Sequence, residues 1–294
     1  MRTHSFLIRI AAVLGAVVVP GSARADEPVA YAPRGSWTAN FADDSCSLER
    51  TFVHEQDTLR LRLRQFVPGD TFEITIASET LEPRRRATNI DFAATSAFQK
   101  IDYYQTFRLE DGQKGVVFSG SLAGSAPDGP AESRSDFSVY ATGSAIDRLT
   151  LSDAFESDLT VLTGSLQQPL QIMESCMDDL LAEWGVNAQA HRSLTRKAEP
   201  NWSDSWIKVS APMQRDFRQQ KGSDRQEVRL IIDEQGKPVG CRVLQWPDDE
   251  PIARRLCSAF LESARIPPAL DNESRPIRSY YVMVLSAILR VEYR

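Results

Sequence analysis

The stretch that decides the fold is residues 228–260, VRLIIDEQGKPVGCRVLQWPDDEPIARRLCSAF. Its first half holds two runs in which every second residue is apolar, separated by the turn Glu234-Gln235-Gly236. This period-two pattern predicts an antiparallel hairpin with one buried face. The residues of that face are Val228, Leu230, Ile232, Val239, Cys241 and Val243.

The second half of the stretch predicts a helix over residues 250–265 that packs on this hairpin. Acidic residues 248–250 favour a helix start there through the helix dipole. Its apolar residues recur at helical spacing and are Ala253, Leu256, Cys257, Phe260 and Ala264. A nearly continuous apolar run at 280–289 then predicts a further strand. The order strand, strand, helix, strand indicates a three-stranded antiparallel sheet backed by helices.

Upstream, residues 31–164 are typical of an antiparallel β sandwich or a barrel-like sheet. In DTLRLRLRQF, Leu59, Leu61 and Leu63 alternate with arginines, and Pro68-Gly69-Asp70 separates this run from TFEITIAS. Further strands are expected in YYQTFRLE, KGVVFSGSL, SDFSVYAT and DRLTLSD, which begin at Tyr103, Lys114, Ser135 and Asp147.

Residues 167–185 predict a helix that closes this β-rich region. Pro169 suits a first helical turn and Gly185 a position just past the end. From 186 to 204 the apolar period lapses, which predicts a linker. We therefore expect an α+β protein with a signal peptide at 1–25, a β-rich N-terminal domain at 26–185, and a C-terminal domain at 205–294.

Four cysteines permit three disulfide connectivities. Cys241 and Cys257 lie on the facing sides of the predicted hairpin and helix, so we expect them to pair. Cys46 and Cys176 would then tie the first element of the N-terminal domain to its last. The alternative for Cys46 and Cys176 is that they remain two separate buried thiols.

The N-terminus has the features of an export signal: arginines near the start, an apolar run at 11–19, and Ala23-Arg24-Ala25 before Asp26. Cleavage between Ala25 and Asp26 would deliver the chain to the periplasm and change its formal charge from −6 to −9. An acidic chain argues against general binding of nucleic acid or anionic lipid. The alternative is that residues 6–20 stay uncleaved as a membrane anchor.

The segment from about 205 to 290 resembles the C-terminal domain of the TonB family of periplasmic energy transducers. The matching stretches are SAPMQRDFRQQKG, VRLIIDEQGKPV, IARRLCSAFLESAR, the corner PPALDNESRPI and the final apolar strand. Asn272-Glu273-Ser274 stands where the family has a glycine in the corner, and the cysteine pair is additional. No cofactor is implied.

The resemblance implies binding of an extended peptide at a sheet edge by β-augmentation, here along Tyr280, Val282 and Val284. The leading hypothesis is a periplasmic adaptor that binds an envelope protein or an extended peptide without catalysis. A membrane-anchored energy transducer for outer-membrane transport is the alternative. It would need the uncleaved anchor.

The sequence predicts no catalytic residue and no metal site. HEQDT at His54 has Thr58 where a zinc helix needs its second histidine, and no cysteines are spaced as a zinc site. A third hypothesis is a hydrolase, which requires a pocket holding His54 or His191 beside a carboxylate. The run Arg84-Arg85-Arg86 is interpreted as a solvated loop, with a phosphate site as the alternative.

Overall fold

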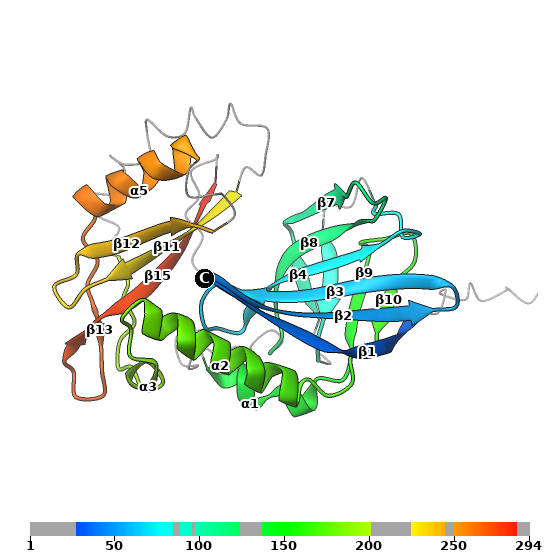
Figure 1. Cartoon of the computed structure of the whole chain (residues 1–294), viewed down its shortest axis with the longest axis horizontal. Coiled ribbons are helices and arrows are strands. Elements are labelled where there is room, and N and C mark those ends of the chain that lie inside the picture. The colour runs from blue at the N-terminus through cyan, green and yellow to red at the C-terminus, as the bar shows by residue number, and fades with distance from the viewer. Residues whose placement is uncertain are drawn as a thin grey trace, which may run out of the picture.

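The computed structural model describes residues 28–84, 89–95, 98–123, 137–200, 225–244 and 250–286. These residues form a mostly β structure with a few helices, as expected for an α+β chain (Figure 1). The strands make a ten-stranded sheet, a three-stranded sheet and a small two-stranded ribbon. The predicted signal segment with Ala25 and Asp26 lies outside the described residues.

The large sheet has the strand order β6-β5-β9-β10-β1-β2-β3-β4-β8-β7. Its neighbouring pairs are antiparallel, as expected, except β1 and β10, whose parallel pairing was not predicted. The strands are β1 (Val29–Ala42), β2 (Ser45–His54), β3 (Asp57–Gln65), β4 (Thr71–Ser78), β5 (Ile90–Ala93), β6 (Gln99–Ile101), β7 (Tyr104–Arg108), β8 (Lys114–Ser121), β9 (Leu149–Ser152) and β10 (Leu159–Val161).

Strand β1 joins the two halves of this sheet. Its first residues pair with β10, and from Ala32 onward it pairs with β2, with a bulge between Arg34 and Thr38. The sheet curves until its far parts meet: the rings of Phe92 and Phe118, on β5 and β8, lie 5.3 Å apart. Sandwiched between the two halves is one apolar core, as the alternating pattern predicted.

The alternation in β3 has the predicted result. Leu59, Leu61 and Leu63 are fully buried, and the arginines between them face outward. There Arg60 pairs with Glu49 at 3.3 Å and Arg64 with Glu73 at 2.9 Å.

The segment SDFSVYAT was wrongly predicted as a strand. Its described part forms the short helix α1 (Ser138–Ala141), followed by the 3-10 turn η2 (Gly143–Ala145). Val139 and Tyr140 are neighbours in sequence and both are buried, which a strand with one covered face does not allow. The Tyr140 hydroxyl donates to Gln65 Oε1 at 2.9 Å.

Helix α2 (Gln167–Glu183) has its predicted extent and buried stripe. Gly185 ends it with φ of +70°, the left-handed conformation that glycine adopts most readily. Cys176 of this helix is bonded to Cys46 of β2, as predicted, so α2 is fastened to the large sheet.

The predicted linker is packed against the protein over its described part. Asn187 caps the helical turn α3 (Ala188–His191) by accepting from the Ala190 amide. Ala198 is buried in the C-terminal core, and the Arg196 and Leu270 backbones are hydrogen-bonded to each other. Residues 201–204 of the predicted linker lie outside the described residues.

The C-terminal region has the predicted order of elements. Strands β11 (Arg225–Ile232), β12 (Pro238–Val243) and β15 (Ser279–Ser286) form a sheet in the order β12-β11-β15, and helix α5 (Pro251–Ser263) lies on it. The predicted bond between Cys241 and Cys257 joins β12 to α5. Val239 was predicted to be buried but is 42% exposed, because the register shifts by one residue between Ile231 and Ile232.

The Pro-rich corner forms the ribbon of β13 (Ala269–Leu270) and β14 (Pro276–Ile277). The Asp271 carboxylate accepts from the amides of Glu273 and Arg275 and holds the turn. Ser274 there has φ of +59°, so a serine occupies left-handed backbone in this corner.

Candidate binding cleft between the two sheets

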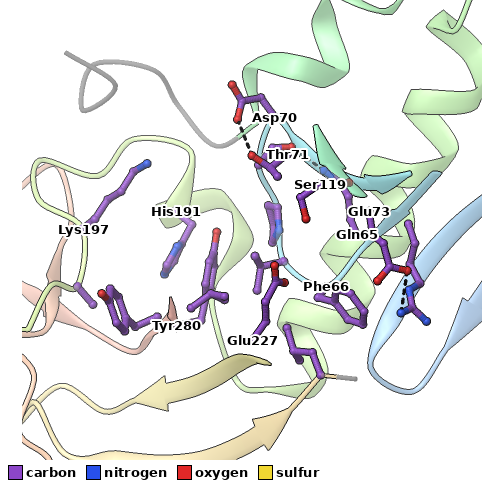
Figure 2. Close-up of a pocket in the computed structure, with 18 of the residues that line it drawn as sticks. Gln65, Phe66, Asp70, Thr71, Glu73, Ser119, His191, Lys197, Glu227 and Tyr280 are labelled. Carbon is purple, nitrogen blue, oxygen red and sulfur yellow. Dashed lines mark hydrogen bonds and ion pairs between the residues drawn. The ribbon is translucent and has the colours of Figure 1, made fainter. Parts of the chain in front are cut away.

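A cleft of about 280 Å³ lies where the large sheet meets the small one (Figure 2). Its first wall is the connection between β3 and β4 together with neighbouring residues of those strands. Its second wall combines β15, the start of β11 and the segment after α3. The cleft is therefore built from parts of the chain that are far apart in sequence.

The first wall is held by hydrogen bonds around the predicted Pro68-Gly69-Asp70 turn. Buried Gln65 donates from Nε2 to the Gly69 carbonyl at 2.5 Å and accepts from Tyr140. The Arg64 guanidinium lies over the Phe66 ring at 4.3 Å. These contacts fix both an aromatic ring and the turn at the cleft margin.

The second wall is a stack of rings. Tyr280 of β15 stacks on His191 with ring centroids 5.2 Å apart, and the Trp184 ring meets the same tyrosine ring edge-on at 6.5 Å. His191 is 5% exposed, and its Nε2 lies 3.2 Å from the Arg278 carbonyl oxygen. His191 therefore lies in this cleft, but as a packed ring.

Arg229 connects the two walls. It extends from β11, is 5% exposed, and donates from Nη1 to the carbonyl oxygens of Asp44 and Phe66 at 3.0 and 3.1 Å. Its guanidinium lies 3.7 Å from the centre of the Trp184 ring. Arg242 adds an ion pair to the Asp44 carboxylate at 3.0 Å. The pattern of β11 predicted that Arg229 points away from α5, but not that it is buried.

Carboxylates outnumber cations along the cleft. Those lining it are Asp70, Glu73, Glu199 and Glu227, and the cations are Arg64 and Lys197. Glu73 is paired with Arg64, and Asp70 accepts from the Ser121 hydroxyl at 3.2 Å.

The three residues predicted for the partner-binding edge lie in different surroundings. Tyr280 and Val282 line the cleft, whereas Val284 is 1% exposed. Their side chains share the sheet face opposite α5, because alternate residues of a strand point the same way. The N-terminal region covers part of that face, so Val284 contributes to the core.

His54, the other histidine that a hydrolase could use, does not line this cleft and lies at the end of β2. Its Nδ1 is 3.0 Å from the Ala30 carbonyl oxygen. Next to it the carboxylate of Asp57 accepts from the hydroxyls of Tyr31 at 2.5 Å and Ser78 at 2.8 Å. The sequence did not reveal this polar cluster, because its members come from three different strands.

Ionisation in the Asp57 cluster follows from its hydrogen bonds. Burial opposes the charged carboxylate, but hydrogen bonds from Thr80, Tyr31 and Ser78 outweigh burial and lower the pKa of Asp57. Burial and the neighbouring Asp57 raise the pKa of the Tyr31 hydroxyl. Asp57 is thus held as a carboxylate and Tyr31 as a neutral donor.

Arg84, from the predicted arginine run, is tied to the loop after β9. It donates to the carbonyl oxygens of Phe155 and Glu156 at 2.6 and 3.0 Å and pairs with Asp153 at 3.2 Å. Arg85 and Arg86 lie outside the described residues.

In the described ranges, no three His, Cys, Asp or Glu side chains gather closely enough to hold a metal ion. Over the same ranges, no helix is long and apolar enough to cross a bilayer. The two disulfides are typical of proteins from oxidising compartments.

No protein-family model, curated protein or solved structure matches this chain. The residues and geometry of the cleft are therefore the basis for a functional assignment.

Proposed function

We propose that this chain is a non-catalytic periplasmic adaptor whose cleft receives an extended segment of an envelope protein. The observation that carries the proposal is the position of the cleft beside residues 280–282 of β15. Among the described residues, β15 is the end strand of the small sheet. A segment laid along it would add a strand by β-augmentation.

The chemistry of the two walls supports this mode of binding. Main-chain hydrogen bonds to a strand supply affinity that is independent of sequence, and side-chain pockets supply specificity. Here Phe66 and Tyr280 offer apolar surface on opposite sides, and carboxylates lie between and above them. Arg229 holds the two walls together, so the cleft is formed before a partner arrives, which reduces the entropic cost of binding.

Panning a random peptide library against the disulfide-bonded protein tests the proposal. Each selected peptide is then resynthesised with single N-methylated amides, which cannot donate. In an added strand only alternate amides face β15, so we expect affinity to fall at every second position. Hydrogen exchange should slow in residues 279–286 and stay unchanged in β12, the opposite edge. Uniform tolerance of N-methylation, or protection of β12 instead, would contradict the proposal.

The adaptor and the two alternative hypotheses differ in measurable ways. A periplasmic adaptor begins at Asp26, whereas an energy transducer retains residues 6–20 in the membrane. Intact mass spectrometry of the native protein distinguishes these cases. A hydrolase would depend on His191 for turnover. Esterase or peptidase activity in the parent protein that is lost in His191→Gln would therefore favour the hydrolase hypothesis over the adaptor.

A further inference from the structure

The two disulfides differ in how completely the chain covers them. Cys46 and Cys176 are 1% and 2% exposed and belong to the core of the large sheet. Cys241 and Cys257 are only partly buried and pack at the margin of the smaller core. Thiol–disulfide exchange requires a thiolate to reach a sulfur atom, so access decides which bond a reductant attacks. The two bonds should therefore react at different rates.

The bond between Cys241 and Cys257 lies at an open border of the C-terminal region. Cys241 is in β12, an end strand of the small sheet as far as the structure describes it. Cys257 borders the buried stripe of α5, and Arg254 and Ser258 near it are exposed. Helix α5 covers the face of the small sheet that is turned away from the large region (Figure 1). A reductant therefore reaches this bond without separating the two regions.

A cation lies one helical turn from this bond. Side chains of a helix lean towards its N-terminus, so Cys257 leans towards the turn that holds Arg254. A positive charge there attracts the thiolate of a reductant and stabilises a departing cysteine thiolate. The charge beside the bond thus favours exchange.

Helix α5 has other contacts that hold it in place when the bond is open. Leu256 and Phe260 are each 1% exposed in the core between α5 and the sheet. Just past the helix, the Ile266 amide donates to the Gly236 carbonyl oxygen at 2.9 Å, which ties that end to the β11–β12 turn. These contacts keep the two thiols near each other, so the bond can form again.

We propose that Cys241–Cys257 is a reversible redox site that exchanges with a dithiol while the protein stays folded. One thiolate of the dithiol attacks a sulfur of the bond, forms a mixed disulfide and releases the other cysteine, which takes up a proton. The second thiolate of the dithiol then displaces the remaining cysteine, which is also protonated. The dithiol becomes a disulfide, and two electrons and two protons pass to the protein. This inference does not depend on the adaptor role.

Reduction of the native protein tests the proposal. The oxidised protein is incubated with dithiothreitol, samples are alkylated with iodoacetamide at intervals, and peptide mass spectrometry locates the label. We expect Cys241 and Cys257 to be labelled at least about tenfold faster than Cys46 and Cys176. In concentrated guanidinium chloride the two bonds should be reduced at similar rates, because unfolding exposes both.

Hydrogen exchange measures what the reduction changes. Because the bond joins β12 to α5, exchange should quicken in these two elements and stay slow in β3 and β4. Oxidised glutathione, added after the dithiol is removed, should restore the bond and the original exchange pattern.

Matched variants test the role of the neighbouring cation. Arg254→Gln should slow the reduction by about two- to threefold. Arg108→Gln makes the same charge change at an exposed position of β7 in the large sheet and should leave the rate unchanged. Equal rates in the two variants would remove the cation from the argument.

Reduced thioredoxin, used at the same dithiol concentration, distinguishes the two sources of a dithiol. Faster reduction by thioredoxin than by dithiothreitol supports a protein-borne dithiol as the natural reactant. Equal or slower reduction supports a small dithiol.

Three results would overturn the proposal: equal labelling of all four cysteines in the native protein, no labelling of any, or loss of slow exchange in β3 and β4 as Cys241–Cys257 opens. The last would mean that the bond is reached only through unfolding. In a Cys241→Ser/Cys257→Ser variant the remaining disulfide should resist dithiothreitol as it does in the parent. If that variant does not fold, the labelling of the parent protein still decides.

Discussion

The large and small sheets bury their faces in different ways. The large sheet curves around its own core, with Phe92 against Phe118, and α2 is bonded to it through Cys46 and Cys176. The small sheet has α5 on one face and part of the N-terminal region on the other, where Arg229 enters. The large region thus supplies a surface that the small region needs, and stability should depend on them unequally.

The largest expected effect on stability comes from removing a disulfide, and it should differ between the two bonds. The bond between Cys46 and Cys176 spans 130 residues, and the bond between Cys241 and Cys257 spans 16. By the loop-entropy estimate, replacing both members with Ala costs about 5 kcal/mol in the first case and about 3 kcal/mol in the second. Urea unfolding of the two double variants measures the difference. Equal losses would mean that loop length does not govern these bonds.

Truncations in the two cores should also affect the two regions differently. Phe92→Ala and Phe260→Ala each remove a fully buried ring and should cost about 3–5 kcal/mol. We expect Phe92→Ala to open both regions, because the small sheet loses the surface it packs on. Phe260→Ala should open the small region and leave slow amide exchange in β3 and β4. Loss of protection everywhere in Phe260→Ala would show instead that the two regions unfold as one unit.

An intermediate effect is expected at the contact between the regions. Arg229→Met leaves the Asp44 and Phe66 carbonyl oxygens without their donor, which should cost about 2–3 kcal/mol in unfolding free energy. Arg254→Met, on the exposed side of α5, is the control and should be nearly neutral. Arg229→Lys should fall between them, because an ammonium cannot reproduce the planar fork. Equal losses of unfolding free energy in Arg229→Met and Arg254→Met would show that Arg229 does not connect the two regions.

The smallest effect concerns pH. The pKa of Asp57 is lower in the folded chain than its ordinary value of 3.8, so the ionised form stabilises the fold. That contribution is complete above about pH 4 and is lost as pH falls through the lowered pKa. Asp57→Asn should therefore show a shallower loss of melting temperature on acidification than the parent. Glu55→Gln, in the turn that precedes Asp57, is the control. The prediction fails if the melting temperature of Glu55→Gln depends on pH in the same way as that of Asp57→Asn.

Much of the fold follows from local patterns. The alternation of Leu59, Leu61 and Leu63, the stripe of α2 and the hairpin of β11 and β12 are each encoded within a few residues. Both cysteine pairs could be predicted because their elements have clear buried sides. Val239 was misplaced because a bulge shifts the period, and a bulge leaves little trace in composition.

The rest depends on segments that meet only in the folded chain. The parallel pairing of β1 with β10 and the curl of the sheet join residues more than a hundred positions apart. The cleft likewise needs the β3–β4 turn to meet β15. Arg229 belongs to the polar face expected for its strand, so its sequence position does not predict that it is buried. Its contacts with the Trp184 ring and the Asp44 carbonyl oxygen form only in the folded chain.

The parallel pairing of β1 with β10 also has a consequence for timing. A chain emerges with its N-terminus first, and Val29–Tyr31 must wait for residues 159–161 before that end of β1 is paired. Cys46 waits longer still, because Cys176 follows after α2 has begun. Contacts between such distant residues form slowly. The first residues of β1 are therefore among the last to be paired, so a helper protein that shields nascent strands would act first on Val29–Tyr31.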